Sequence, residues 1–98
     1  MKANQIVSEN IKSNIKDATI WYNKRVKGLG NKFTSEVRDK VKFITENPLS
    51  FQIRYDKIRV AIIDSFPYTI HYYYDESKNN VVFLAVFHTS RNPEIWLK

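Results

Sequence analysis

The chain begins with a stretch whose apolar residues repeat at helical spacing. Ser8 is a suitable N-cap for a helix that starts just after it. Beyond it, apolar residues recur at steps of four, three and four, on one helical face: Ile11, Ile15, Ala18 and Tyr22. The only two glycines, Gly28 and Gly30, predict that this helix ends near the sequence KGLG.

A second stretch repeats the same spacing directly after the glycines. Its apolar positions are Phe33, Val37, Val41 and Ile44. Pro48 disfavours the α conformation at Asn47 and therefore predicts the end of this helix. Since only residues 28–30 turn the chain, the two helices are expected to form an antiparallel hairpin, whose joint apolar stripe requires a sheet to cover it.

From residue 58 onward the apolar period changes from helical spacing to strict alternation. The apolar residues that alternate along the two predicted strands are Ile58, Val60 and Ile62, then Tyr68, Ile70, Tyr72 and Tyr74. The polar tract DESKNN predicts a turn, and VVFLAVFH predicts a strand buried on both faces in the middle of the sheet. The segment ANQIV near the start is expected to add an edge strand.

These elements predict an α+β fold, in which an N-terminal antiparallel helical hairpin packs on a small antiparallel β-sheet. The far face of that sheet is expected to be only partly closed and to carry Arg59, Thr69 and His71. Ninety-eight residues allow one small domain, so residues 1–98 are expected to form a single unit.

Composition excludes some kinds of chemistry but leaves several classes of partner open. The formal charge of +6 favours acidic partners such as nucleic acid, an acidic protein or an anionic membrane surface. The absence of cysteine excludes disulfides, thiolate catalysis and Cys-ligated zinc. No apolar run is long enough to span a bilayer and the N-terminus lacks a signal-peptide core, so a cytoplasmic protein is expected.

The candidate chemistry is carried by Arg, Tyr and His side chains. No glycine-rich phosphate loop and no metal-ligand spacing occurs, so neither a cofactor nor a metal is expected. The strands and their ends supply the remaining candidates: Arg54, Arg59, Tyr68, Tyr72, His88 and Arg91. Such side chains suit metal-independent acid–base cleavage of RNA, and they suit protein recognition equally well.

Each candidate also has a structural interpretation. Tyr68 and Tyr72 occupy alternate strand positions that suit core or rim packing with a satisfied hydroxyl. His88 suits a strand end where its ring bonds to backbone, and Trp96 suits a plug at the C-terminal edge. Arg59 has Asp56 and Asp64 nearby in the sequence as ion-pair partners, whereas Arg91 follows the last strand, where a surface cation reaches a ligand.

Three segments resemble the ParE branch of the RelE/ParE toxin superfamily, the toxins of type II toxin–antitoxin systems. They are ATIWYNKRVKGLGNKF, ENPLSFQIRYDKIRVAIIDSFPYTIHYYY and LAVFHTSRNPEIW. Family members end on a strand that runs into the residues matched here by His88, Arg91, Pro93 and Trp96. The resemblance implies the small RelE-like α+β fold and a cognate antitoxin, which would wrap the toxin and whose acidity would suit the basic charge. It also implies contact with operator DNA only through the antitoxin complex.

The resemblance implies a target as well. The mRNA-cleaving RelE branch typically has an Arg where this chain has Thr69, and a hydroxyl cannot replace that fixed charge at a phosphorane-like transition state. The ParE branch is associated with growth arrest and plasmid stabilisation through binding of DNA gyrase. The expected target-binding residues are Arg59, Tyr68, Tyr72, His88, Arg91 and Trp96.

Two alternatives remain open from the sequence. The first is a ribosome-dependent mRNA endonuclease, with Arg59 and Arg91 on phosphate and His88 or Tyr72 transferring protons. The second is a decayed toxin that retains only antitoxin binding. The target, the antitoxin's identity and the oligomeric state are not fixed by residue patterns.

Overall fold

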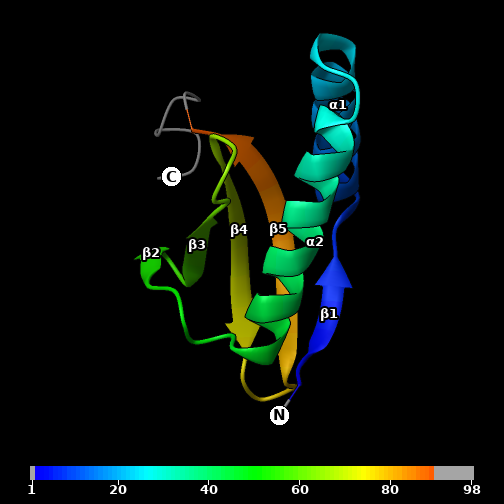
Figure 1. The fold of residues 1–98 in the computed structure, drawn as a ribbon. Helices are drawn as coiled ribbons and strands as arrows, with labels where there is room; N and C mark the ends of the chain where they lie inside the picture. Colours follow the sequence, from blue (N-terminus) through cyan, green and yellow to red (C-terminus); the bar gives the residue numbers. More distant parts are fainter. Residues whose placement is uncertain (1, 90–98) are drawn as a thin grey trace.

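Two helices and a five-stranded sheet make up the fold in the computed structural model, which describes residues 2–89 (Figure 1). The strand order in the sheet is β1-β5-β4-β3-β2. The elements follow one another along the chain as β1 (Asn4–Val7), α1 (Glu9–Arg25), α2 (Leu29–Glu46), β2 (Ile53–Tyr55), β3 (Ile58–Ile62), β4 (Tyr68–Asp75) and β5 (Asn80–His88). The predicted α+β class is therefore confirmed.

The sheet is mixed rather than wholly antiparallel. Strands β2 to β5 form the predicted antiparallel meander, but β1 pairs in parallel with β5, from Asn4 opposite Asn80 to Val7 opposite Phe83. The amide of Asn4 donates to the carbonyl of Asn79 at 2.9 Å, so β1 starts where the β4–β5 turn ends. Both strands run away from that turn, which makes this edge parallel. Strand β2, absent from the prediction, forms the opposite edge.

Strand β5 lies between β1 and β4, while β4 is the central strand. The helix-facing side of β5 is buried at Val81, Phe83 and Val86, whereas Leu84 of the same strand is only half-buried. The prediction of burial on both faces therefore holds for part of the strand. The register shift between His71 and Tyr72 leaves Leu84 as an extra residue, a β-bulge in β5.

The junction between β1 and α1 is a single residue, Ser8. Its hydroxyl accepts from the amide of Ile11 at 3.3 Å, which confirms the predicted N-cap. The same hydroxyl donates to the carbonyl of Leu84 at 2.9 Å. One side chain thus starts α1 and satisfies the carbonyl exposed by the bulge in β5.

The two helices approach closely where they turn. Gly28 has φ of +84°, a left-handed conformation that glycine adopts at little cost. Gly30 lies in the first turn of α2, not in the gap where the sequence placed it, and its amide donates to Asn23 Oδ1 at 2.7 Å. The hydroxyls of Thr19 and Thr34 lie 2.8 Å apart across the same interface.

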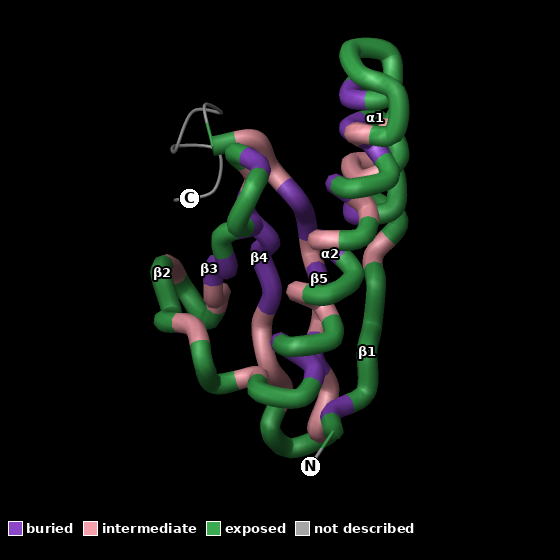
Figure 2. Tube along the Cα trace, viewed as in Figure 1, coloured by how far each residue is buried: buried purple, intermediate pink, exposed green. Residues whose placement is uncertain are grey.

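The apolar stripes of both helices cover one face of the sheet, as predicted (Figure 2). An aromatic cluster joins the layers where Phe33 of α2 meets Phe66, in the β3–β4 connection, with ring centroids 5.2 Å apart. The fully buried side chains of the core include Ile11, Phe33, Ile44, Ile63, Ile70, Tyr72, Val81 and Phe83. The half-buried Ile15 and Val41 pack at its margin.

Replacing Gly30 with alanine is expected to destabilise the fold by about 1 to 3 kcal/mol, because the new methyl group would overlap the backbone carbonyl oxygen of Thr19. Chemical denaturation of Gly30→Ala beside the wild type measures this loss. Ser35→Ala, at an exposed position of α2, is the control and should change the free energy of unfolding little. A Gly30→Ala protein as stable as the wild type would contradict the close approach.

Candidate functional site

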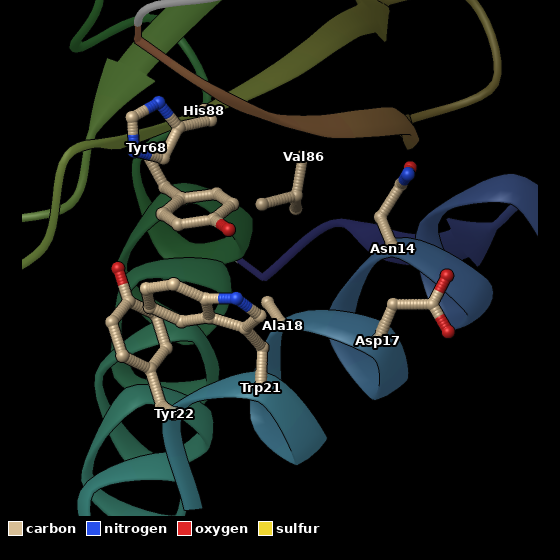
Figure 3. Close-up of a pocket in the computed structure, with 8 residues that line it drawn as sticks. All are labelled: Asn14, Asp17, Ala18, Trp21, Tyr22, Tyr68, Val86 and His88. Carbon is tan, nitrogen blue, oxygen red and sulfur yellow. The ribbon is translucent and has the colours of Figure 1, made fainter. Parts of the chain in front are cut away.

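A pocket of about 370 Å³ lies between α1 and the ends of β4 and β5 (Figure 3). We call it the α1–β5 pocket, and its lining residues are Asn14, Asp17, Ala18, Trp21, Tyr22, Tyr68, Val86 and His88. Two of the predicted target-binding residues, Tyr68 and His88, stand on its sheet side. The four α1 side chains Asn14, Asp17, Trp21 and Tyr22 stand opposite them.

Strand pairing brings Tyr68 and His88 together. Tyr68 is the first residue of β4 and His88 the last of β5, and the two are paired in register. Their rings meet edge to face with centroids 5.1 Å apart. The amide of Thr89 donates to the carbonyl of Pro67 at 2.8 Å, which holds the two strand ends in place.

The helical wall presents an exposed aromatic ring. Trp21 is 51% exposed, and the guanidinium of Arg25 lies 4.4 Å from its ring centroid, a cation–π geometry. Trp21 precedes the buried Tyr22, so it lies about a quarter turn away from the apolar stripe of α1. Its indole is therefore directed to the pocket while Tyr22 anchors the helix against the core.

The pocket combines apolar rings with a few hydrogen-bonding groups. Indole, phenol and imidazole groups line one side of the pocket, and the amide of Asn14 and the carboxylate of Asp17 lie on its other side (Figure 3). Aromatic residues of this kind supply a large part of the binding free energy at protein interfaces. The arrangement suits recognition of a protein surface.

Arg59 and Tyr72 lie elsewhere, beside each other on the helix-facing side of the sheet. The Tyr72 side chain is fully buried and its hydroxyl donates to the carbonyl of Pro48 at 3.0 Å. The Arg59 guanidinium donates to the carbonyl of Phe51 at 2.5 Å. Both side chains thus fasten the loop between α2 and β2, and the expectation that Arg59 lies on the far face is wrong.

Asp64, one of the two carboxylates suggested as a partner for Arg59, forms an ion pair with Lys40 instead. The Asp64 carboxylate lies 3.5 Å from Nζ of Lys40 on α2, so it links the β3–β4 connection to that helix.

Burial raises the pKa of the Tyr72 hydroxyl to about 12, although the nearby Arg59 charge and a hydrogen bond from the backbone of Phe51 lower it. A hydroxyl with that pKa stays protonated at neutral pH.

The remaining predicted residues fall into two groups. Arg54 is exposed on the edge strand β2, next to Ile53, which is the register partner of Arg59. Arg91 and Trp96 lie outside the described residues, as does Pro93. The structure therefore brings together Tyr68 and His88, and separately Arg59 and Tyr72.

His71 forms a buried hydrogen-bonded relay on the face of the sheet away from the helices. Tyr55 OH lies 2.9 Å from His71 Nδ1, and Thr69 Oγ1 lies 3.0 Å from His71 Nε2. Because the Thr69 hydroxyl donates to the carbonyl of Phe87 at 3.4 Å, it accepts from Nε2–H, and Nδ1 then accepts from Tyr55. This network ties the edge strand β2 to β4 and β5.

Burial favours the neutral form of His71. His71 is 1% exposed, and burial lowers the pKa of its imidazole to about 4. Thr69 is buried as well, so the far face is closed over both residues, whereas Ile62 on the same face stays 59% exposed. The expectation of a partly closed face is thus confirmed in outline, but its histidine is not accessible.

Within residues 2–89 no group of His, Asp and Glu side chains is arranged to hold a metal ion. No helix in that part of the chain is long and apolar enough to cross a membrane.

Comparison with known proteins decides the family. Residues 6–93 match the model described as the ParE toxin of type II toxin–antitoxin system, parDE. The chain belongs to the ParE toxin family. A comparison with curated proteins gives no match.

Two solved structures share the fold of this ParE-family chain. A chain of the chromosomal ParDE toxin–antitoxin system from P. aeruginosa has a TM-score of 0.77 at 9% identity, covering 89% of this chain and 96% of its own. A chain of the RelBE2 toxin–antitoxin complex from Mycobacterium tuberculosis has a TM-score of 0.66 at 15% identity, covering 90% and 92%. At these identities the likeness concerns the fold.

Sequence reasoning missed the helical half of the pocket of this ParE-family toxin. Asn14, Asp17 and Trp21 were not among its candidates, yet all three line the pocket. A signal existed for Trp21, since a tryptophan outside the apolar stripe of an amphipathic helix is not explained by the core. Asn14 and Asp17 carry no such signal, because polar residues on an outer helical face are ordinary.

The free energy of unfolding is expected to depend on pH through His71. The unfolded chain binds this proton near the ordinary pKa of 6.5 and the folded chain only near 4. Stability from this residue is therefore complete above the upper value and falls by about 3 kcal/mol as the pH drops through that window. Denaturation at several pH values, compared with His71→Gln, measures the effect. Parallel stability curves for the two proteins would contradict it.

Proposed function

We propose that this ParE-family toxin arrests growth by binding DNA gyrase, that it acts in the cytoplasm without a cofactor, and that a cognate antitoxin neutralises it. Residues 1–98 act as one toxin domain in this proposal. Family membership supports the toxin assignment. The similarity to chains from ParDE and RelBE2 toxin–antitoxin systems supports an antitoxin partner.

The observation that carries the choice of binding over catalysis is the separation of Arg59 and Tyr72 from His88. Arg59 and Tyr72 both donate hydrogen bonds to backbone carbonyls of the loop between α2 and β2. His88 is paired with Tyr68, the first residue of β4 and four residues before Tyr72, and lies in the α1–β5 pocket. Acid–base catalysis needs the base and the acid within hydrogen-bond reach of one substrate, and this arrangement does not favour it.

Thr69 and His71 add support to this choice. Thr69 holds the position where the RelE branch has an Arg, and its hydroxyl is used by His71 and the Phe87 carbonyl. Burial lowers the pKa of the His71 imidazole to about 4, so it is neutral at physiological pH, and both of its ring nitrogens are already hydrogen-bonded. Neither residue can provide a positive charge for a phosphate transition state.

The α1–β5 pocket is the proposed target-contact surface. It gathers Trp21, Tyr68 and His88 in one hollow with exposed aromatic area. Arg91 and Trp96 are also target-binding residues in our proposal, and both lie outside the described residues. Arg59 and Tyr72 contribute by holding the sheet and the loop before β2 in place.

A second hollow is the proposed antitoxin site. This groove of about 220 Å³ beside β1 is lined by Val7, Ile11, Ile15, Thr34, Val37, Arg38, Val41 and Phe83. Its lining is mainly aliphatic, and β1 beside it is an edge strand with exposed Ile6 and Val7. An acidic amphipathic segment would cover the apolar lining and pair with Arg38. Operator DNA would then be bound through the antitoxin.

Induced expression without antitoxin is expected to stop DNA synthesis before protein synthesis. Pulse labelling of both in the same culture measures the order, because gyrase inhibition blocks replication directly whereas mRNA cleavage blocks translation first. Early loss of protein synthesis would favour the endonuclease instead. Unimpaired growth would leave a decayed toxin that retains only antitoxin binding.

Trp21→Ala is expected to reduce gyrase binding by at least about tenfold, which corresponds to roughly 1.4 kcal/mol, because it removes the exposed indole of the pocket. Purified toxin and gyrase in a binding titration test this. Phe43→Ala is the matched control, since Phe43 is also a half-exposed aromatic residue on a helix, but it lines the separate hollow beside Lys40. Equal losses for both variants would argue against the pocket as the contact surface.

A further inference from the structure

The turn between the two helices carries most of the molecule's excess positive charge. Residues 18–35 contain four basic residues and no acidic residue, so this segment contributes four of the six net positive charges. The four are Lys24, Arg25, Lys27 and Lys32, and all are exposed. We call residues 24–32 the hairpin tip.

The hairpin tip projects away from the body of the protein. In Figure 1 the helical turn rises past the ends of β4 and β5, and Figure 2 shows that its outer surface is exposed. The chain turns there over residues 26–28, between the end of α1 and the start of α2. The basic side chains therefore stand on a convex end, where a partner can approach from several directions.

Only two of these four basic residues stand where a positive charge stabilises a helix. Lys24 and Arg25 lie in the last turn of α1, where a positive charge interacts favourably with the helix dipole. Lys27 and Lys32 flank the start of α2, where the dipole favours acidic residues instead. The first turn of α2 has no acidic residue, and its N-cap Gly28 provides no side-chain hydrogen bond. The charge at this position thus opposes folding slightly and points to an anionic partner.

Two exposed apolar side chains lie near the tip. Trp21 stacks with Arg25 one turn below, and Val26 at the turn is 57% exposed. The tip itself projects from the body of the protein and carries four cations within residues 24–32 (Figure 1). Closely spaced cations on a projecting end match the regular phosphates of a nucleic acid duplex.

We propose that the hairpin tip binds the phosphate backbone of duplex DNA. Two packed helices are too wide to enter a major groove of about 12 Å, so the contact is to phosphates and does not read the base sequence. The proposal rests on the proposed function and deepens it, because gyrase holds duplex DNA. Trp21 belongs both to the α1–β5 pocket and to the base of the tip, so a toxin bound to gyrase through this pocket would present the tip to a neighbouring duplex.

The test is binding of purified full-length chain to a fluorescently labelled DNA duplex, followed by anisotropy between about 50 and about 200 mM salt. In the double variant Lys27→Gln/Lys32→Gln, affinity is expected to fall, and the slope of log affinity against log salt should become shallower by about two. The thermal midpoint should stay constant or rise, because the start of α2 disfavours positive charge.

The control is Lys57→Gln/Lys78→Gln, which removes the same charge from the β2–β3 and β4–β5 turns. It should keep the wild-type salt slope. Equal weakening by both double variants would overturn the proposal, because it would show attraction by net charge alone. So would a fall in the thermal midpoint of the tip variant that matches its loss of binding.

Two further results also decide the question. Tighter binding to an RNA duplex of the same sequence, or no binding to DNA at all, would overturn the proposal. Because gyrase is absent from this assay, either failure leaves the growth-arrest result unaffected. A chain that binds DNA through the tip without stopping DNA synthesis would overturn the gyrase target and leave the tip proposal standing.

Discussion

Burial of Phe33 is the constraint on which the arrangement of helices and sheet depends. Its ring has no exposed area and contacts Tyr22 of α1, Phe66 of the β3–β4 connection and Tyr68 of β4. Aromatic rings bury more area than any other side chains, so a cluster of four fixes the layers strongly. Two members of the cluster, Tyr22 of α1 and Tyr68 of β4, also line the α1–β5 pocket, one on each wall.

Much of this architecture is readable from the sequence, because it depends on local periodicity. The stripes of α1 and α2 predict both helices, and alternation through Ile58–Ile62 and Tyr68–Asp75 predicts two strands. The direction of β1 was not predictable in this way, since it depends on where its first residues meet the β4–β5 turn. The three residues of β2 are too few to show a period.

The candidate site was only partly predictable for a related reason. Tyr68 is the first residue of the β4–β5 hairpin and His88 is its last, so antiparallel pairing brings them together at the open end. The burial of His71 cannot be read from alternation, because it requires Tyr55 from an edge strand and Thr69 two residues earlier to satisfy both ring nitrogens. Nor does the sequence show that Arg59 and Tyr72 donate to carbonyls of the loop that follows α2.

The parallel pairing of β1 with β5 has a consequence for the synthesis of this toxin. The first strand finds its partner between residues 80 and 83, so this pairing waits until most of the chain has been made. Such long-range contacts form late, because the intervening chain must be ordered first. A chain interrupted before β5 has neither the partner of β1 nor the sheet side of the α1–β5 pocket. Incomplete translation products therefore lack the surface that we propose for target contact.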